Sequence, residues 1–173
     1  VAFVGSGNLG RRAAEQAIEA AAKTDEAFGA RTRYALSEVR LLAPIARPRV
    51  IRDFLTFEGH MLTAGKALGR PQIPPVWYEV PAYYKGDPDT VSGPDAVVEW
   101  PTYCEKFDFE LELAMVIGRR GKNIKKADAM KHVAGYCTVN DLSEREFQVE
   151  RSGQWTKGKS YDTFGPIGPW LVT

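Results

Sequence analysis

Three acidic residues alternate with apolar ones along the segment FDFELELAMVIG, residues 107–118. In an extended strand Asp108, Glu110 and Glu112 share one face, while Phe109 and its alternate neighbours share the other. Carboxylates brought close together repel one another, which raises their pKa values unless a positive charge compensates. A hard divalent cation would supply that charge, and so would lysine partners on a solvated face. Taken alone, the segment leaves both interpretations open.

A further carboxylate, Asp141, ends a second apolar segment, GYCTVND, at residues 135–141. Asn140 and Asp141 stand where a buried strand opens into a polar loop. With Glu110 and Glu112, Asp141 would complete a site of oxygen ligands that leaves positions for water and substrate. Asp53 is a candidate for one more ligand. This second segment shifts the balance towards a metal site.

The chain has two histidines and two cysteines, and their contexts differ. His60 lies in DFLTFEGH beside Glu58. His132 lies in KKADAMKHV, where we expect a surface helix and a structural role. Cys104 and Cys137 lack the spacing of zinc ligands and the histidine context of a nucleophile, so we expect both to pack in the interior.

Two glycine-rich strings look like phosphate-binding motifs but lack the flanking structure that such motifs need. GSGNLG at residues 5–10 fits a dinucleotide-binding pattern, yet no second strand with an acidic residue follows about 20 residues later. GQWTKGKS at residues 153–160 fits a P-loop string. The segment before it is too polar for a buried strand, and the prolines and glycines of 161–170 exclude a helix after it. We expect no nucleotide at either string, which leaves Lys159 without an assigned role.

Length and charge restrict the broad class of protein. The chain has 173 residues, about one domain, and its 44% hydrophobic content is ordinary for a globular protein. Its formal net charge of +1 lacks the positive field of a general nucleic-acid binder. No apolar run approaches the roughly 20 residues of a membrane span, and the start does not look like a signal peptide. We expect a cytoplasmic protein with no nucleic-acid or membrane partner.

Local patterns predict the elements that must position these side chains. We expect helices over 11–23, the middle of 53–70 and 125–134, and strands over 107–118 and 135–141. Short extended stretches are expected within 37–50, 77–84 and 86–101. Irregular backbone is expected from 152 to the end, where Gly, Pro and aromatic residues dominate. A linker near 24–36 would separate a helical arm, 1–36, from a catalytic body, 37–173.

The run from Arg40 to Thr173 resembles the fumarylacetoacetate hydrolase family. The specific pattern is FDFELELAMVIG followed by AGYCTVNDLSEREFQ and QWTKGKSYDTFGPIGPWLVT, and LLAPIARP, RDFLTFEGH and WYEVPAYY match in order and spacing. The resemblance implies an α+β fold with a mixed β-sandwich or β-roll catalytic domain after a short helical N-terminal arm. Because family members continue beyond the position of Thr173, the C-terminal part of that domain is expected to be missing here.

The resemblance also implies roles for particular residues. The implied metal ligands are Glu110, Glu112, Asp141 and Asp53, holding Mg²⁺ or Mn²⁺, with Ca²⁺ as a further candidate. The implied substrate-contacting groups are Lys159, Gln148 and Tyr84, and Arg145 matches a structural arginine. His60 matches the catalytic base. Many members carry its glutamate partner where this chain has Thr63, so either Glu58 orients His60 or the partner lies outside this chain.

The implied reaction is metal-dependent hydrolysis of a C–C bond in an acylpyruvate-like or 2,4-diketo acid, in the catabolism of aromatic compounds or sugar acids. The implied partners are a small anionic 2-oxo or diketo acid and a second copy of the chain in a homodimer. The alternatives are a decarboxylase, isomerase, hydratase or ureidoglycolate lyase on the same scaffold, and a non-catalytic protein with this fold. The tail of the sequence resembles members acting on sugar acids and its front resembles fumarylacetoacetases, so the substrate stays open.

Overall fold

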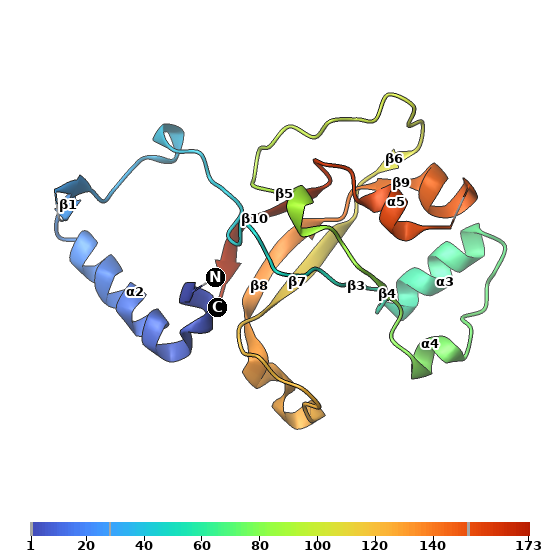
Figure 1. Ribbon diagram of the computed structural model, residues 1–173, viewed down its shortest axis with the longest axis horizontal. Helices are drawn as coiled ribbons and strands as arrows, with labels where there is room; N and C mark the ends of the chain where they lie inside the picture. The colour runs from blue at the N-terminus through green and yellow to red at the C-terminus, as the bar shows by residue number, and fades with distance from the viewer. Residues whose placement is uncertain (1, 28, 152) are drawn as a thin grey trace.

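A four-stranded sheet lies at the centre of the computed structural model, which describes residues 2–27, 29–151 and 153–173 (Figure 1). Its order is β5-β10-β8-β7, formed by β5 (Val91–Ser92), β10 (Gly165–Val172), β8 (Val133–Asn140) and β7 (Leu111–Ile117). β8 runs antiparallel to both of its neighbours, and β5 pairs with β10 in parallel. The two strands expected from the sequence near 107–118 and 135–141 are therefore confirmed as neighbours.

The segment 107–118 forms two strands rather than one. β6 (Phe107–Asp108) pairs with β9 (Ser143–Glu144), and β7 begins only at Leu111. Between them, the Glu110 N–H donates to Asn140 Oδ1 at 3.1 Å, and the Asp141 N–H donates to Glu110 O at 2.9 Å. These two hydrogen bonds hold the segment between β6 and β7 against the end of β8, which brings Glu110 and Asp141 together.

The C-terminal region is more regular than its composition suggests, and the expectation of irregular backbone from residue 152 is wrong. α5 (Trp155–Lys159) is followed by β10, which pairs with β8. The register shifts between Gly168 and Val172, so Pro169 falls in an irregular stretch of the ladder. Proline removes a ladder donor, and a bulge is a position where a strand tolerates that loss.

The aromatic segment 77–84 is extended only at its end. Its first half lies in α4 (Val76–Glu79), and β4 (Tyr83–Tyr84) follows and pairs with β3 (Asp53–Phe54). Pro74 and Pro75 stand directly before α4, and proline favours the start of a helix because its φ is already helical. The helix expected within 53–70 is confirmed as α3 (Glu58–Ala67). Figure 1 shows α3 and α4 projecting from one side of the molecule.

The remaining short elements are irregular turns of helix. Among the described residues of 37–50 no strand forms, and the 3₁₀ helix η1 (Leu36–Glu38) overlaps the start of this stretch. η2 (Pro88–Thr90) leads into β5, η3 (Lys126–His132) leads into β8 and confirms the helical turn expected there, and the π-helical turn η4 (Glu146–Arg151) precedes α5. His132 Nδ1 lies 3.0 Å from Arg119 O, which fits its expected structural role.

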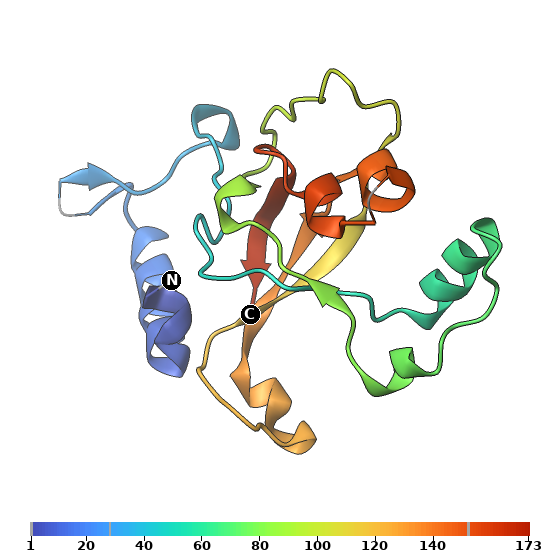
Figure 2. The ribbon, with the colours of Figure 1, turned by 45° about the vertical axis from the view of Figure 1, so that its right-hand side comes forward.

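The N-terminal arm consists of α1 (Ala2–Gly5), α2 (Gly7–Ala21) and a hairpin of β1 (Glu26–Ala27) and β2 (Ala30–Arg31). Figures 1 and 2 show it standing beside the sheet. α2 contains most of the predicted helix 11–23, and α1 precedes it. A division of the chain at residue 36 stays a prediction.

The core lies on one face of the sheet only. Its buried apolar side chains are Cys104, Cys137, Leu142 and Phe164, which confirms the packing role expected for the cysteines. The alternate residues of β7, from Glu112 to Val116, face this side and are half-buried, whereas Leu111, Leu113, Met115 and Ile117 are exposed. The face of β7 that carries Glu112 is therefore the one that faces the core. Within the described residues, no helix is long and apolar enough to cross a membrane.

Candidate metal centre

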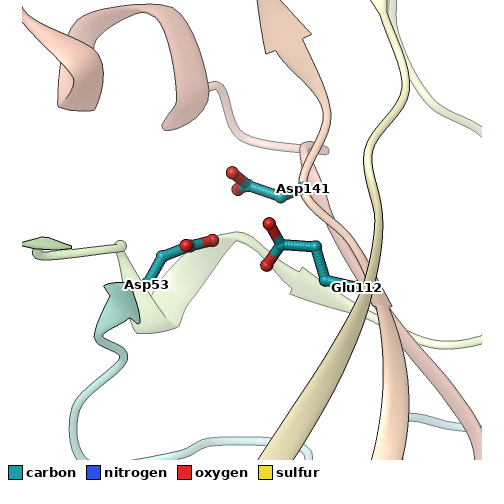
Figure 3. Close-up of side chains that lie close together, drawn as sticks. All are labelled: Asp53, Glu112 and Asp141. Atoms are coloured by element: carbon teal, nitrogen blue, oxygen red, sulfur yellow. The ribbon is translucent and has the colours of Figure 1, made fainter. Parts of the chain in front are cut away.

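Three carboxylates from distant parts of the chain meet at one edge of the core. Asp53 comes from β3, Glu112 from β7, and Asp141 from the residue directly after β8. One oxygen of each lies within 4.8 Å of the others, and Figure 3 shows the three groups pointing towards a common centre. Asp141 is 6% exposed and the other two are half-buried. We refer to these three residues as the acidic triad.

The pKa values of two carboxyl groups in the acidic triad lie above their usual range. Burial raises the pKa of Asp53 to about 9, with contributions from its hydrogen bond to Glu112 and from the charge of Asp141. Burial and the charges of Asp141 and Glu110 also raise the pKa of Glu112. Carboxylate groups resist ionisation where too much negative charge is concentrated. Oxygen ligands with that surplus charge fit a hard divalent cation.

Pairing between β3 and β4 fixes the position of Asp53. Asp53 stands opposite Tyr84 in this short ladder, and the Tyr84 hydroxyl donates a hydrogen bond to Asp141. Burial and the neighbouring Asp141 charge raise the pKa of Tyr84, so its phenol keeps the proton that it donates. Tyr84 thus ties the β3–β4 ladder to the end of β8 and holds two members of the acidic triad in place.

Glu110 lies next to the acidic triad but is not one of its members. Its Oε2 accepts a hydrogen bond from Lys159 Nζ at 2.9 Å, and its Oε1 pairs with Arg145. Burial alone would raise the pKa of Glu110, but the two cations bring it below its usual value. Glu110, one of the four sequence-predicted ligands, therefore already has two cationic partners.

Arg145 joins several of the polar groups beside the acidic triad. Its guanidinium donates to Asp108 Oδ2 at 2.7 Å from Nη2, to Glu110, and to Gln148 Oε1 at 2.9 Å. Arg145 thereby neutralises two of the three carboxylates that alternate along residues 108–112. Reasoning from the residues alone missed this role, although an arginine four positions after Asp141 was the available signal.

Lys159 brings a buried ammonium to the acidic triad. Its side chain is 4% exposed, and Nζ donates to both Asp141 and Glu110. α5 can place it there because Gly158 packs closely against the preceding segment: a Cβ on Gly158 would lie 2.6 Å from Glu144 O. Gln148, 8% exposed, accepts a hydrogen bond from Arg145 through its Oε1. The expected substrate-contacting groups Lys159, Gln148 and Tyr84 are thus adjacent to the triad or to its partners.

The structure holds His60 and Glu58 apart from this network. Both are exposed on α3. The Glu58 carboxylate accepts a hydrogen bond from the Tyr78 hydroxyl at 2.5 Å. Across residues 2–27, 29–151 and 153–173, no hydrogen bond or ion pair joins His60 to Glu58 or to the acidic triad. Their roles as base and orienting acid stay predictions.

A cavity of about 540 Å³, open to solvent, is lined in part by Tyr84, the hydrogen-bond partner of Asp141. It lies between the β4 segment, including Tyr83 and Tyr84, and the loop into α5, including Trp155. Tyr84 is the shared wall, because it lines the cavity and also donates to Asp141. Sequence reasoning did not identify Tyr83 or Trp155, since nothing in the local pattern places these two segments side by side.

Comparison with known proteins gives matches over most of the chain. A family model described as "Fumarylacetoacetate (FAA) hydrolase C-terminal" matches residues 49–173. A protein of Burkholderia cenocepacia named "Putative hydrolase" is 56% identical over 84 residues, which is 49% of this chain and 30% of that protein. The match with this curated relative thus covers less than a third of the relative's length.

Solved structures show the same fold. A 5-carboxymethyl-2-hydroxymuconate delta-isomerase from Mycobacterium smegmatis superposes with a TM-score of 0.65 and 33% identity, covering 82% of this chain and 53% of that one. A fumarylacetoacetate hydrolase from Exiguobacterium antarcticum gives 0.61 and 30%, covering 84% and 49%. These matches confirm the α+β architecture with a helical N-terminal arm that the sequence predicts.

Proposed function

The chain belongs to the fumarylacetoacetate hydrolase family, and from that premise we propose that it is a divalent-metal-dependent hydrolase of C–C bonds in acylpyruvate-like or 2,4-diketo acids. The observation that carries the proposal is the acidic triad: three inward carboxylates, two with raised pKa values, beside a buried lysine. Such a concentration of perturbed groups is typical of a functional site.

Asp53, Glu112 and Asp141 would hold the metal, with Glu110 as a further candidate. Mg²⁺ and Mn²⁺ suit an all-oxygen ligand set, and Ca²⁺ is the larger alternative. When bound, the cation supplies Lewis acidity and a template for the adjacent oxygens of a 2-oxo acid. The small anionic substrate accordingly needs no strong field from the protein as a whole, whose formal net charge is +1.

Lys159 is proposed to stabilise the charge that develops on the substrate. In the hydrolysis, water adds to the distal carbonyl, the bond between that carbon and the methylene breaks, and the electron pair remains on the 2-oxo acid fragment. A buried ammonium is a preorganised partner for this developing enolate, and it does not have to be desolvated during the reaction. Gln148 and Tyr84 are the proposed additional contacts to substrate oxygens.

His60 is the proposed base that takes a proton from the attacking water. Its exposed position on α3, a helix that stands at the edge of the molecule, means that the role requires α3 to approach the acidic triad. Glu58 is the candidate orienting acid within this chain. A second copy in a homodimer is part of the proposal and rests on the family alone.

Isomerisation is the second candidate reaction. It is favoured by the likeness to solved isomerases of Mycobacterium species at 33% identity. An isomerase on this site would move a proton between two carbons of the same acid and would release no second product. The two reactions therefore differ in product number, which makes them separable in one assay.

The test is a panel of 2-oxo and 2,4-dioxo acids incubated with the protein and Mg²⁺ or Mn²⁺, with products identified by NMR. Hydrolysis predicts two acids from each 2,4-dioxo acid, and isomerisation predicts one tautomer. His60→Ala should reduce turnover by roughly 10²-fold or more. His132→Ala is the matched control, because it replaces the other histidine of the chain. No turnover of any acid would contradict the proposed activity. Full turnover by His60→Ala would contradict the role of His60 as the base.

A further inference from the structure

The cavity beside the acidic triad has a lining that differs sharply from the triad itself. One wall is Pro81, Tyr83 and Tyr84 from the β4 segment, and the other is Gln154, Trp155 and Thr156 from the start of α5. None of the residues described as lining it carries a charged side chain. The lining combines aromatic rings with neutral polar groups, which suits an uncharged organic group.

Tyr84 connects the two environments. Its hydroxyl donates to Asp141, and its ring lies 5.7 Å from Lys159 Nζ. A ligand whose charged end lies at the triad and Lys159 would therefore extend past the Tyr84 ring into the cavity. Because α5 carries both Trp155 at its first residue and Lys159 at its last, one short helix contributes to both ends of this path.

From this arrangement we infer that the cavity between β4 and the start of α5 is the subsite for the distal part of the substrate, and that it selects an uncharged alkyl or aryl tail over one that ends in a carboxylate. The inference rests on the proposed function, since it takes the acidic triad to hold the other end of the substrate. Trp155 is the specificity-determining residue, because it is the aromatic side chain that α5 contributes to the lining.

The selectivity follows from the groups that line the cavity. A tail that ends in a carboxylate gains no cationic partner among the lining residues, whereas an alkyl or aryl tail gains contact with aromatic side chains. The guanidinium of Arg52 lies 5.8 Å from the centroid of the Tyr83 ring, but Arg52 is not one of the lining residues. An alkyl or aryl tail would pack against the Trp155 and Tyr84 side chains instead.

Binding of N-substituted oxamates tests this subsite without turnover. An oxamate carries a carboxylate next to a carbonyl, as a 2-oxo acid does, and its nitrogen substituent represents the tail. Calorimetric titration with Mn²⁺ present would compare N-benzyl oxamate with N-(2-carboxyethyl) oxamate. We expect the benzyl compound to bind roughly tenfold more tightly to the wild-type chain. Equal binding, tighter binding of the carboxyethyl compound, or binding of neither would overturn the subsite.

Two variants locate the preference in the cavity. Trp155→Ala should reduce the roughly tenfold ratio to about twofold. Thr156→Arg places a cation at an exposed position of the lining and should reverse the ratio in favour of the carboxyethyl compound. Trp170→Ala is the matched control, since Trp170 is 64% exposed on β10 and does not line the cavity. A ratio that neither lining variant changes would contradict the inference even if one of them folds poorly.

Turnover separates this inference from the proposed function. If acylpyruvates are not cleaved while the oxamates still show the predicted preference, the hydrolase proposal fails and the subsite stands. If acylpyruvates are cleaved but the oxamates show no preference for the neutral tail, the subsite fails and the hydrolase proposal stands.

Discussion

Lys159 donates a hydrogen bond to Asp141, so a buried ammonium touches one of the three carboxylates of the acidic triad. The same nitrogen lies 2.9 Å from Glu110 Oε2. A divalent cation held by the triad would therefore lie close to an existing positive charge. In the proposed reaction Lys159 would lower the negative charge available to the metal and would at the same time offer a cation to the substrate.

This relationship predicts opposite effects of Lys159→Met on metal affinity and on turnover. Removal of the ammonium leaves Asp141 free of its competing partner, so Mn²⁺ should bind at least about tenfold more tightly, while turnover is lost. Calorimetry and the acid panel measure the two effects. Lys157→Met, on the exposed side of α5, is the matched control and should change neither. Weaker metal binding by Lys159→Met would argue against this competition.

The raised pKa of Asp53 predicts how the stability of the metal-free protein depends on pH. The pKa of Asp53 is raised from its ordinary value of 3.8 to about 9 in the folded chain, so between these values the folded state holds a proton that the unfolded state has released. The unfolding free energy of the metal-free protein should therefore fall as pH rises from about 5 to 9. Urea unfolding at several pH values measures this slope.

Asp53→Asn should flatten that slope, because an amide has no proton to lose. Asp162→Asn, at an exposed position, is the control and should leave the slope unchanged. Saturating Mg²⁺ should also remove the slope in the wild-type chain, since metal ligation favours the ionised carboxylate. A slope of the same size in Asp53→Asn would show that another group causes it.

Tyr84→Phe tests the tie between β4 and the end of β8. The variant loses one hydrogen bond to a charged acceptor, so the free energy of unfolding should fall by about 1.5 kcal/mol. Chemical denaturation measures the change. Tyr83→Phe is the matched control from the same strand, because within the described residues no hydrogen bond of its hydroxyl is found. If both variants lose the same free energy of unfolding, the hydrogen bond from Tyr84 to Asp141 does not stabilise the fold.

The sequence predicted the elements whose pattern is local. Strict alternation in residues 107–118 and the apolar run before Asp141 identify β7 and β8, and the spacing of their acidic residues indicates that carboxylates gather where these strands meet. The composition after residue 152 predicted irregular backbone, but β10 forms there because β8 supplies its ladder. Pairing with a distant strand outweighed the local preference of Gly and Pro.

The division of the carboxylates could not be predicted from spacing. Alternation treats Asp108, Glu110 and Glu112 as equivalent, whereas the structure gives cationic partners to the first two and leaves the third facing Asp53. That difference depends on Arg145 and Lys159, which lie 35 and 49 residues from Glu110 in the sequence. Only the folded arrangement of β9 and α5 brings them there.

The central claim is that the acidic triad binds a divalent cation, and a calorimetric titration of the metal-free chain with Mn²⁺ tests it most directly. The wild-type chain should bind one ion, and Asp141→Asn and Glu112→Gln should each bind at least about tenfold more weakly. Asp128→Asn, which removes a carboxylate paired with Lys131 far from the triad, should bind as the wild-type chain does. Absence of binding by the wild-type chain, or undiminished binding by both triad variants, would contradict the claim.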